Sequence, residues 1–263
     1  MHAALIGRIG RFTLDRGHTY IHMASILGQV AGAFLRLSFL NHVVRRVLVK
    51  QIYFTSVEAV PVIFGSALIL GSIMVNALLA LLTSLGAYDQ IGEYLLKVMF
   101  YELAPITCTI VLLLRSGTAI ISEVALMKIN REMDTLNILG VDLMEYIFLP
   151  RILAFIISGP ALAFCFSIVG LIGGFLTLGF FHDITFDNYV DQLFLTVQEH
   201  DFLILLLKSF FLSLAVVLVC LQKGITVRSS FTEVPIKLIQ GMMHTMFMII
   251  FIEVLFSIAS RLL

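Results

Sequence analysis

Five stretches of the chain are long and apolar enough to cross a lipid bilayer, and they constrain the fold more than any other feature. A spanning helix needs about 20 mostly apolar residues, because it rises about 1.5 Å per residue through a hydrocarbon core about 30 Å thick. The sequence meets this requirement at residues 54–82, 98–121, 147–181, 202–221 and 238–258. Backbone groups inside lipid must bond within their own segment, so each stretch is predicted to be helical. The predicted fold class is therefore an all-α integral membrane protein with five transmembrane helices.

Composition supports a membrane environment and excludes an ordinary soluble domain. The chain is 60% hydrophobic and 13% charged, whereas soluble domains are about 45–50% apolar and about 25% charged. Its formal net charge is zero, so no overall field favours nucleic acid as a partner. The three cysteines, Cys108, Cys165 and Cys220, are far apart within apolar runs. This spacing favours small buried side chains over a metal site or a disulfide framework.

The first 50 residues differ from the rest of the chain. They hold seven of the 17 Lys and Arg residues and a single acid, Asp15. A basic amphipathic segment of this kind is typical of a helix that lies in the membrane interface beside anionic headgroups. The alternative is a sixth span over residues 20–40, in which Arg36 would lie near one end. We therefore divide the chain into an interfacial segment, 1–50, and a transmembrane domain, 51–263.

The distribution of basic residues between the loops predicts the orientation. Lys and Arg resist translocation, so the basic N-terminal segment should be cytoplasmic. Five spans then place the 83–97 loop, the 182–201 loop and the C-terminus outside. The 182–201 loop is acidic, whereas the inner connections carry most of the remaining Lys and Arg residues. The acidic outer loop and the basic inner connections both predict a cytoplasmic N-terminus and an external C-terminus.

Three charged residues fall at a similar depth on three different predicted spans: Glu102, Lys208 and Glu253. Charges inside a bilayer are costly, so they face one another or a polar cavity. Two interpretations remain open: the side chains reach towards the membrane interface or neutralise one another, or they form a polar patch that lines a cavity between the spans. Arg115 lies thirteen residues beyond Glu102, which is about 20 Å along a helix, so these two side chains are not expected to pair directly.

Small residues recur at a spacing of four in two spans. Gly170 and Gly174 form a GxxxG pattern in the third span, and Ala67 and Gly71 repeat the spacing in the first. Such pairs allow helix backbones to approach closely. Close packing within one subunit is the favoured interpretation, and a seam between two copies is the alternative.

The loop between the second and third spans, residues 122–146, contains a helical pattern. Its apolar positions recur at helical spacing: Leu126, Ile129, Met133 and Leu136. Charged residues occupy its other faces: Lys128, Arg131, Glu132 and Asp134. The pattern predicts an amphipathic helix parallel to the membrane, whose charged face is either simply solvated or offered to a cytoplasmic partner.

No catalytic motif accompanies these features. The sequence has no GxxxxGK[ST] phosphate loop, no HExxH and no GxSxG. We therefore expect no catalytic residues, no metal site and no cofactor in this chain. If transport requires ATP, another chain must bind ATP and Mg²⁺ and hydrolyse the nucleotide.

A run of about fifty residues, 101–151, resembles the signature of the MlaE-type permease family. The matching elements occur in the family's order: Glu102-Leu103-Ala104-Pro105, Arg115-Ser116-Gly117-Thr118-Ala119, Ser122-Glu123, Leu126-Met127, Glu132 and Pro150-Arg151. The chain departs from the pattern at Ala104 and Leu114, where the family usually has glycine. Members of this family are the membrane subunits of ABC transporters that work with MCE-domain proteins.

The resemblance implies a concrete set of partners. Such permeases form homodimers of five-span subunits with an N-terminal interfacial helix, in the bacterial inner membrane. A cytoplasmic ATPase dimer binds the short helix between the second and third spans, and an MCE protein sits on the outer face. Lipid, usually phospholipid, passes through a cavity between the subunits. The candidate ATPase-coupling residues are then Glu123, Lys128, Arg131, Glu132 and Met133, and the lipid-path candidates are Glu102, Lys208 and Glu253.

Two other functions remain compatible with the sequence. The first is an ion- or proton-coupled secondary carrier that uses Glu102 and Glu253 as relay groups. The second is a membrane scaffold that only anchors partners. Association with an ATPase would favour the permease, whereas transport driven by an ion gradient without ATP would favour the carrier.

Overall fold

The computed structural model describes residues 23, 25–30, 32–34, 42–86, 91–182, 198–228 and 230–259. Most of the predicted interfacial segment and most of the 182–201 loop lie outside these residues. Within the N-terminal segment, the described residues from Ser25 to Phe34 belong to a short apolar helix. The helix α2 (His42–Thr55) crosses position 50, so the first long helix begins before the transmembrane domain as we delimited it.

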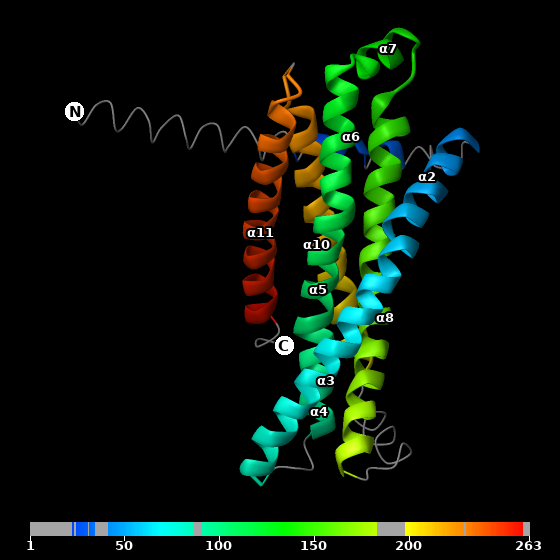
Figure 1. The fold of residues 1–263 in the computed structure, drawn as a ribbon. Coiled ribbons are helices and arrows are strands. Elements are labelled where there is room, and N and C mark those ends of the chain that lie inside the picture. Colours follow the sequence, from blue (N-terminus) through cyan, green and yellow to red (C-terminus); the bar gives the residue numbers. More distant parts are fainter. Residues whose placement is uncertain are drawn as a thin grey trace, which may run out of the picture.

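The prediction of an all-α protein with five long apolar helices is confirmed, and the chain is a multi-pass membrane protein (Figure 1). The first helix combines α2, the 3-10 turn η2 (Val57–Ala59) and α3 (Val60–Ser84). The second is assembled from α4 (Ile91–Lys97), η4 (Val98–Leu103), α5 (Ala104–Leu112), η5 (Leu113–Gly117) and α6 (Thr118–Ile129). The third begins with η6 (Met144–Phe148) and continues as α8 (Leu149–His182). The last two are α10 (Glu199–Ile225) and α11 (Glu233–Ala259).

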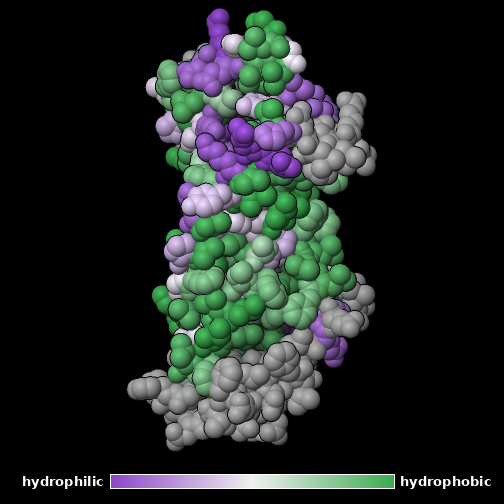
Figure 2. All heavy atoms as spheres, turned by 90° about the vertical axis from the view of Figure 1, so that its right-hand side faces the viewer, coloured by the Kyte–Doolittle hydropathy of each residue, from purple (hydrophilic) through white to green (hydrophobic). Residues whose placement is uncertain are grey.

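The helices form an elongated bundle with two distinct ends (Figure 1). The short helix α7 (Glu132–Ile138) caps one end, which we call the α7 end. The helix α4 lies near the opposite end, which we call the α4 end. Figure 2 shows hydrophilic residues gathered towards the α7 end on one face, with hydrophobic residues below them. This distribution suits a bundle whose middle lies in lipid and whose α7 end reaches water.

Within the described residues, turns of π-helix interrupt the second long helix twice and begin the third. They are η4, η5 and η6, at residues 98–103, 113–117 and 144–148. A π turn inserts one residue into a helical turn, so it rotates the following side chains relative to the preceding ones. Such turns are frequent at functional sites, and here η4 and η5 carry the charged residues Glu102 and Arg115.

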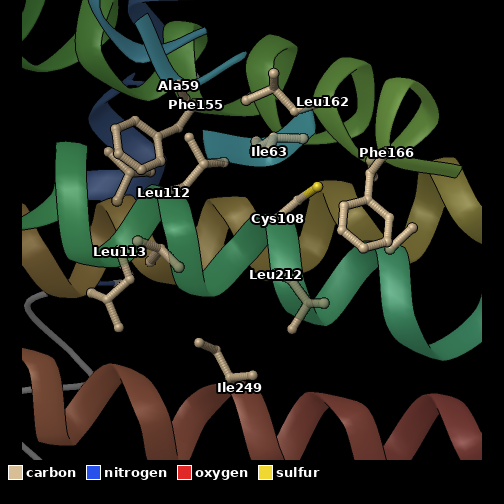
Figure 3. Close-up of a cluster of buried hydrophobic side chains, with 14 of the residues drawn as sticks. Ala59, Ile63, Cys108, Leu112, Leu113, Phe155, Leu162, Phe166, Leu212 and Ile249 are labelled. Carbon is tan, nitrogen blue, oxygen red and sulfur yellow. The ribbon is translucent and has the colours of Figure 1, made fainter. Parts of the chain in front are cut away.

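The core of the bundle is apolar and continuous (Figure 3). Phe155 and Phe166 of α8 are fully buried, together with Ile63 of α3, Leu112 of α5 and Leu212 of α10. In contrast, α11 contributes few buried residues, and Ile249 is its one labelled member of the core in Figure 3. Most of the α11 surface therefore remains available to lipid or to another chain.

The small residues of the first and third spans pack against each other within one subunit, as favoured from the sequence. A Cβ atom added to Gly71 would lie 2.1 Å from the carbonyl oxygen of Gly170. A Cβ on Gly173 would lie 2.8 Å from the Leu68 carbonyl oxygen. In addition, the Ser72 hydroxyl donates to the carbonyl of Gly173 at 3.0 Å. At Gly71 and Gly173 the backbones of α3 and α8 are thus too close for any residue larger than glycine.

Candidate functional site

A charged cluster lies inside the bundle near the α4 end. We call Glu102, Lys208 and Glu253 the Lys208 cluster. The Nζ atom of Lys208 is 2.7 Å from Oε1 of Glu253 and 3.4 Å from Oε2 of Glu102. The lysine side chain is 2% exposed, whereas that of Glu102 is 46% exposed. The structure thus brings together the three lipid-path candidates from η4, α10 and α11.

The local sequence gives Lys208 a further partner in the second span. Pro105 has no N–H to donate to the carbonyl of Tyr101, four residues earlier in the helix. Lys208 Nζ donates to that carbonyl oxygen instead. The Tyr101 hydroxyl in turn donates to Asp201 in the first turn of α10. The π turn η4 is therefore hydrogen-bonded to α10 at two points, through the carbonyl and the hydroxyl of Tyr101.

The cluster contains more carboxylates than cations. It combines one ammonium with two carboxylates. Both oxygens of Glu253 are buried, and Oε1 lies 2.7 Å from the Lys208 ammonium, so this carboxylate is engaged inside the subunit. The Glu102 carboxylate is partly exposed and can still meet a ligand from outside the subunit. The arrangement can hold a polar or charged group at this depth.

A second charged pair, which we call the Arg115 pair, lies between the first two spans. Arg115 of η5 binds the carboxylate of Glu58, which lies in the 3-10 turn η2. Its guanidinium also donates to the Phe54 carbonyl at 2.5 Å and lies 5.0 Å from the centroid of the Phe54 ring. Carbonyls in the last turn of a helix lack intrahelical donors. Arg115 supplies such a donor where α2 ends. The Arg115 pair therefore connects the turn η2 of the first span with the turn η5 of the second.

A third pair places Glu123, a predicted coupling residue, within the bundle wall. Its Oε2 atom is 2.8 Å from Nη2 of Arg151 in the first turn of α8. The Arg151 side chain is buried, and its Nη1 donates to the Ile147 carbonyl at 2.9 Å. Glu123 lies in α6, where it holds the second span against the third.

The predicted amphipathic helix in the 122–146 loop is divided into two parts. The second span continues as α6 to Ile129, so Lys128 also belongs to the spanning helix. The chain then turns at Arg131, whose φ of 58° is left-handed, and α7 follows. Gly140, with φ of 76°, ends α7 in a Schellman motif, in which Val141 N–H donates to the Leu136 carbonyl. The separate helix is therefore shorter than the sequence pattern suggested.

The faces of α7 have different surroundings. Met133 is buried and anchors the helix to the bundle, whereas Arg131 and Glu132 are exposed. Two large apolar side chains at its C-terminal end are also exposed, Ile138 at 86% and Leu139 at 70%. Exposed apolar side chains beside exposed charges are typical of a protein-binding surface.

A family model, described as permease MlaE, matches residues 48–259. The chain belongs to the MlaE permease family. All three charged groups and α7 lie inside the matched range. Among the described residues of this MlaE-family chain, no group of three His, Cys, Asp or Glu side chains could hold a metal ion.

Three individual relatives of this MlaE-family chain share between 24% and 29% of their residues with it over the matched regions. The intermembrane phospholipid transport system permease protein MlaE of Haemophilus influenzae is 29% identical over 129 residues, 49% of each chain. A probable ABC transporter permease of Rickettsia prowazekii is 24% identical over 162 residues, 62% of each. A probable ABC transporter permease of Synechocystis is 25% identical over 219 residues, 81% of this chain and 82% of the relative. The match thus spans about half the length of the Haemophilus relative.

Sequence reasoning missed two features of the site. The pairing of Glu58 with Arg115 was not predicted. A usable signal existed, because Arg115 lies about 20 Å beyond Glu102, towards the predicted cytoplasmic end of the second span, and Glu58 lies near the predicted cytoplasmic start of the first. Arg151 was noticed only as part of the family motif, and its pairing with Glu123 was not predicted.

Proposed function

We propose that this chain is the membrane subunit of an ATP-driven phospholipid transporter of the bacterial inner membrane. Membership in the MlaE permease family supports this function, as does similarity to the phospholipid transport permease of Haemophilus influenzae and to a probable ABC transporter permease of Rickettsia prowazekii. The chain carries no phosphate loop, so ATP and Mg²⁺ would be bound by a separate ATPase dimer. The permease itself is then non-catalytic.

The observation that carries the proposal is the Lys208 cluster. A transported phospholipid needs polar contacts for its headgroup while its acyl chains remain in apolar surroundings. The cluster offers an ammonium and a partly exposed carboxylate towards the α4 end of a bundle whose core is largely apolar. In the proposed path, Lys208 contacts the phosphate or neutralises a carboxylate while Glu102 faces the lipid.

The weakly buried helix α11 supports a second copy of the chain as a partner. Its exposed apolar residues include Phe247, Ile250 and Phe251. A homodimer that covers this face would enclose a cavity between the subunits beside Glu253. Lipid would pass through this cavity between the inner membrane and an MCE-domain protein at the α4 end.

At the other end, α7 is the proposed docking helix for the ATPase. Its exposed Arg131, Glu132, Ile138 and Leu139 suit a groove on a cytoplasmic protein. The proposed orientation therefore has α7 and the N-terminus in the cytoplasm, and the α4 end and the C-terminus outside. The basic N-terminal segment favours the same direction.

Reconstitution tests the function directly. The permease is co-purified with its ATPase and placed in vesicles that contain a fluorescent phospholipid, and the soluble MCE domain is added outside. We expect lipid exchange with the MCE domain that requires ATP and persists without an ion gradient. Exchange driven by a proton gradient without ATP would instead identify a secondary carrier. A stable assembly that exchanges no lipid under either condition would identify a scaffold.

A further inference from the structure

A cavity of about 490 Å³ lies at the α7 end of the bundle, between α2, α6 and the η6–α8 junction. This volume falls within the about 300–1,000 Å³ that is usual for small-molecule sites. Much of the wall is apolar: Val47, Phe54, Ala119, Ile120, Met127 and Ile147. The cavity is separate from the Lys208 cluster, because Ile120 lies eighteen residues beyond Glu102 on the second span, about 27 Å along the helix.

The polar part of the wall carries an excess of positive charge. Among the described residues that line it, the charged ones are Lys50, Glu123 and Arg151, two cations and one carboxylate. Glu123 binds Nη2 of Arg151. The buried Nε of Arg151 has no hydrogen-bond partner in the described part of the chain. Lys50 is exposed, and none of the described carboxylates forms an ion pair with it. Lys50 therefore remains as an accessible donor for an anionic group, and the buried guanidinium of Arg151 adds positive charge behind it.

The position of the cavity along α2 indicates the source of its ligand. Basic residues occupy α2 up to Lys50, and the long apolar stretch begins directly after it. Lys50 therefore marks the level at which the bilayer changes from headgroups to acyl chains, where lysine side chains reach towards phosphates. Phe54, four residues further along α2, lies on the same side of the helix and deeper in the hydrocarbon.

We propose that this cavity binds an anionic phospholipid from the leaflet at the α7 end. The phosphate lies beside Lys50 and Arg151, and the first part of an acyl chain lies against Phe54, Ile120 and Ile147. Glu123 remains on Nη2 of Arg151, so the phosphate does not need to displace it. The bound lipid joins the helices that surround α7, and it is a resident lipid distinct from the transported one.

The absence of tryptophan from the chain makes a fluorescence test possible. A single tryptophan is introduced as Tyr146→Trp, in the cavity wall, or as Val49→Trp, which is lipid-exposed at the same level and outside the wall. Each full-length variant is placed in nanodiscs with brominated phosphatidylglycerol or brominated phosphatidylcholine as quencher. Tyr146→Trp should be quenched by the anionic lipid at about fivefold lower mole fraction, the effect expected of one basic residue near anionic headgroups. Val49→Trp should show no such preference.

Further variants show whether the basic residue is responsible. Lys50→Gln should abolish the preference at Tyr146→Trp, whereas Arg45→Gln, on another face of α2, should preserve it. Millimolar inorganic phosphate should not relieve the quenching; relief would mean that free phosphate rather than lipid is the ligand. Equal quenching by both lipids, weak quenching by either, or an unchanged preference in Lys50→Gln would overturn the proposal. Thermal unfolding of each variant confirms that the fold is retained.

Discussion

Lys208 and Glu253 form an ion pair inside the bundle, with Nζ 2.7 Å from Oε1. The lysine side chain is almost fully buried, and the same ammonium donates to the Tyr101 carbonyl. A buried charge is tolerated only when partners replace its lost hydration. Removal of Lys208 would therefore affect two carboxylates and one backbone carbonyl at the same time.

The first prediction concerns the stability of this cluster. Lys208→Met keeps the volume of the side chain but leaves Glu102 and Glu253 close together without a cation. Breaking a buried ion pair by removing one partner costs about 3–5 kcal/mol. We therefore expect a clear loss of thermal stability in detergent, measured by unfolding of the purified protein.

A triple variant separates the structural role of the cluster from its role in transport. Glu102→Gln, Lys208→Met and Glu253→Gln together remove all three charges. Stability should recover largely, because an uncharged cluster no longer contains an unpaired ion. Lipid exchange should remain impaired if the charges contact the headgroup. Recovery of both stability and exchange would show that the charges are only structural.

The second prediction uses two glycines of the same helix, α3. Gly71→Ala would place a methyl group 2.1 Å from the backbone oxygen of Gly170, so the two spanning helices must separate. Gly65→Ala meets nothing within 4 Å. We expect Gly71→Ala to lower the unfolding temperature strongly, whereas Gly65→Ala should leave it unchanged or slightly raised, because alanine favours the helix. Similar effects of the two substitutions would contradict the close approach of α3 and α8.

Much of the fold could be predicted from the sequence, because one physical requirement dominates it. Lipid offers no hydrogen bonds, so long apolar stretches must be helices, and all five were located. The proximity of Glu102, Lys208 and Glu253 could also be predicted, since the depth of each residue along its span can be counted from the residue numbers. Depth alone left open whether the three side chains face one another, and the structure shows that they do.

Features that depend on helix irregularity could not be predicted. The π turns at η4 and η5 rotate Glu102 and Arg115 relative to a regular helix, and hydrophobic periodicity does not reveal them. The break before α7 was missed for a related reason. It occurs at Arg131 in a left-handed conformation that glycine or asparagine usually adopts. The other end of α7, at Gly140, carried the expected glycine signal.

The third prediction tests the proposed orientation by single-cysteine labelling. Ile138 at the C-terminal end of α7 and Leu85 beyond the end of α3 are both exposed and lie at opposite ends of the bundle. Each is replaced by cysteine in a background without Cys108, Cys165 and Cys220. An impermeant maleimide added to intact cells with a permeable outer envelope should label Leu85→Cys at once. Ile138→Cys should react only after the inner membrane is broken, and the reverse pattern would invert the proposed topology.

The last prediction concerns ATPase docking on α7. Arg131→Glu with Glu132→Lys reverses two exposed charges, and Ile138→Asp places a charge on a side chain that is 86% exposed. Neither change disturbs the buried Met133, so insertion and thermal stability should remain close to those of the unaltered protein. Both changes should weaken recovery of the ATPase in pull-downs, because a charge buried in an interface without a partner is strongly unfavourable.

Leu85→Asp is the matched control for this docking test. Leu85 is also a large exposed apolar residue, at 69%, but it lies at the α4 end. It should reduce neither ATPase recovery nor ATP hydrolysis by the complex. If all three variants recover the ATPase equally, α7 is only a solvated helix, and the ATPase must bind another part of the α7 end. If Leu85→Asp alone reduces recovery, both the docking site and the proposed orientation are wrong. The result therefore distinguishes a docking helix from a general sensitivity of the bundle to new surface charge.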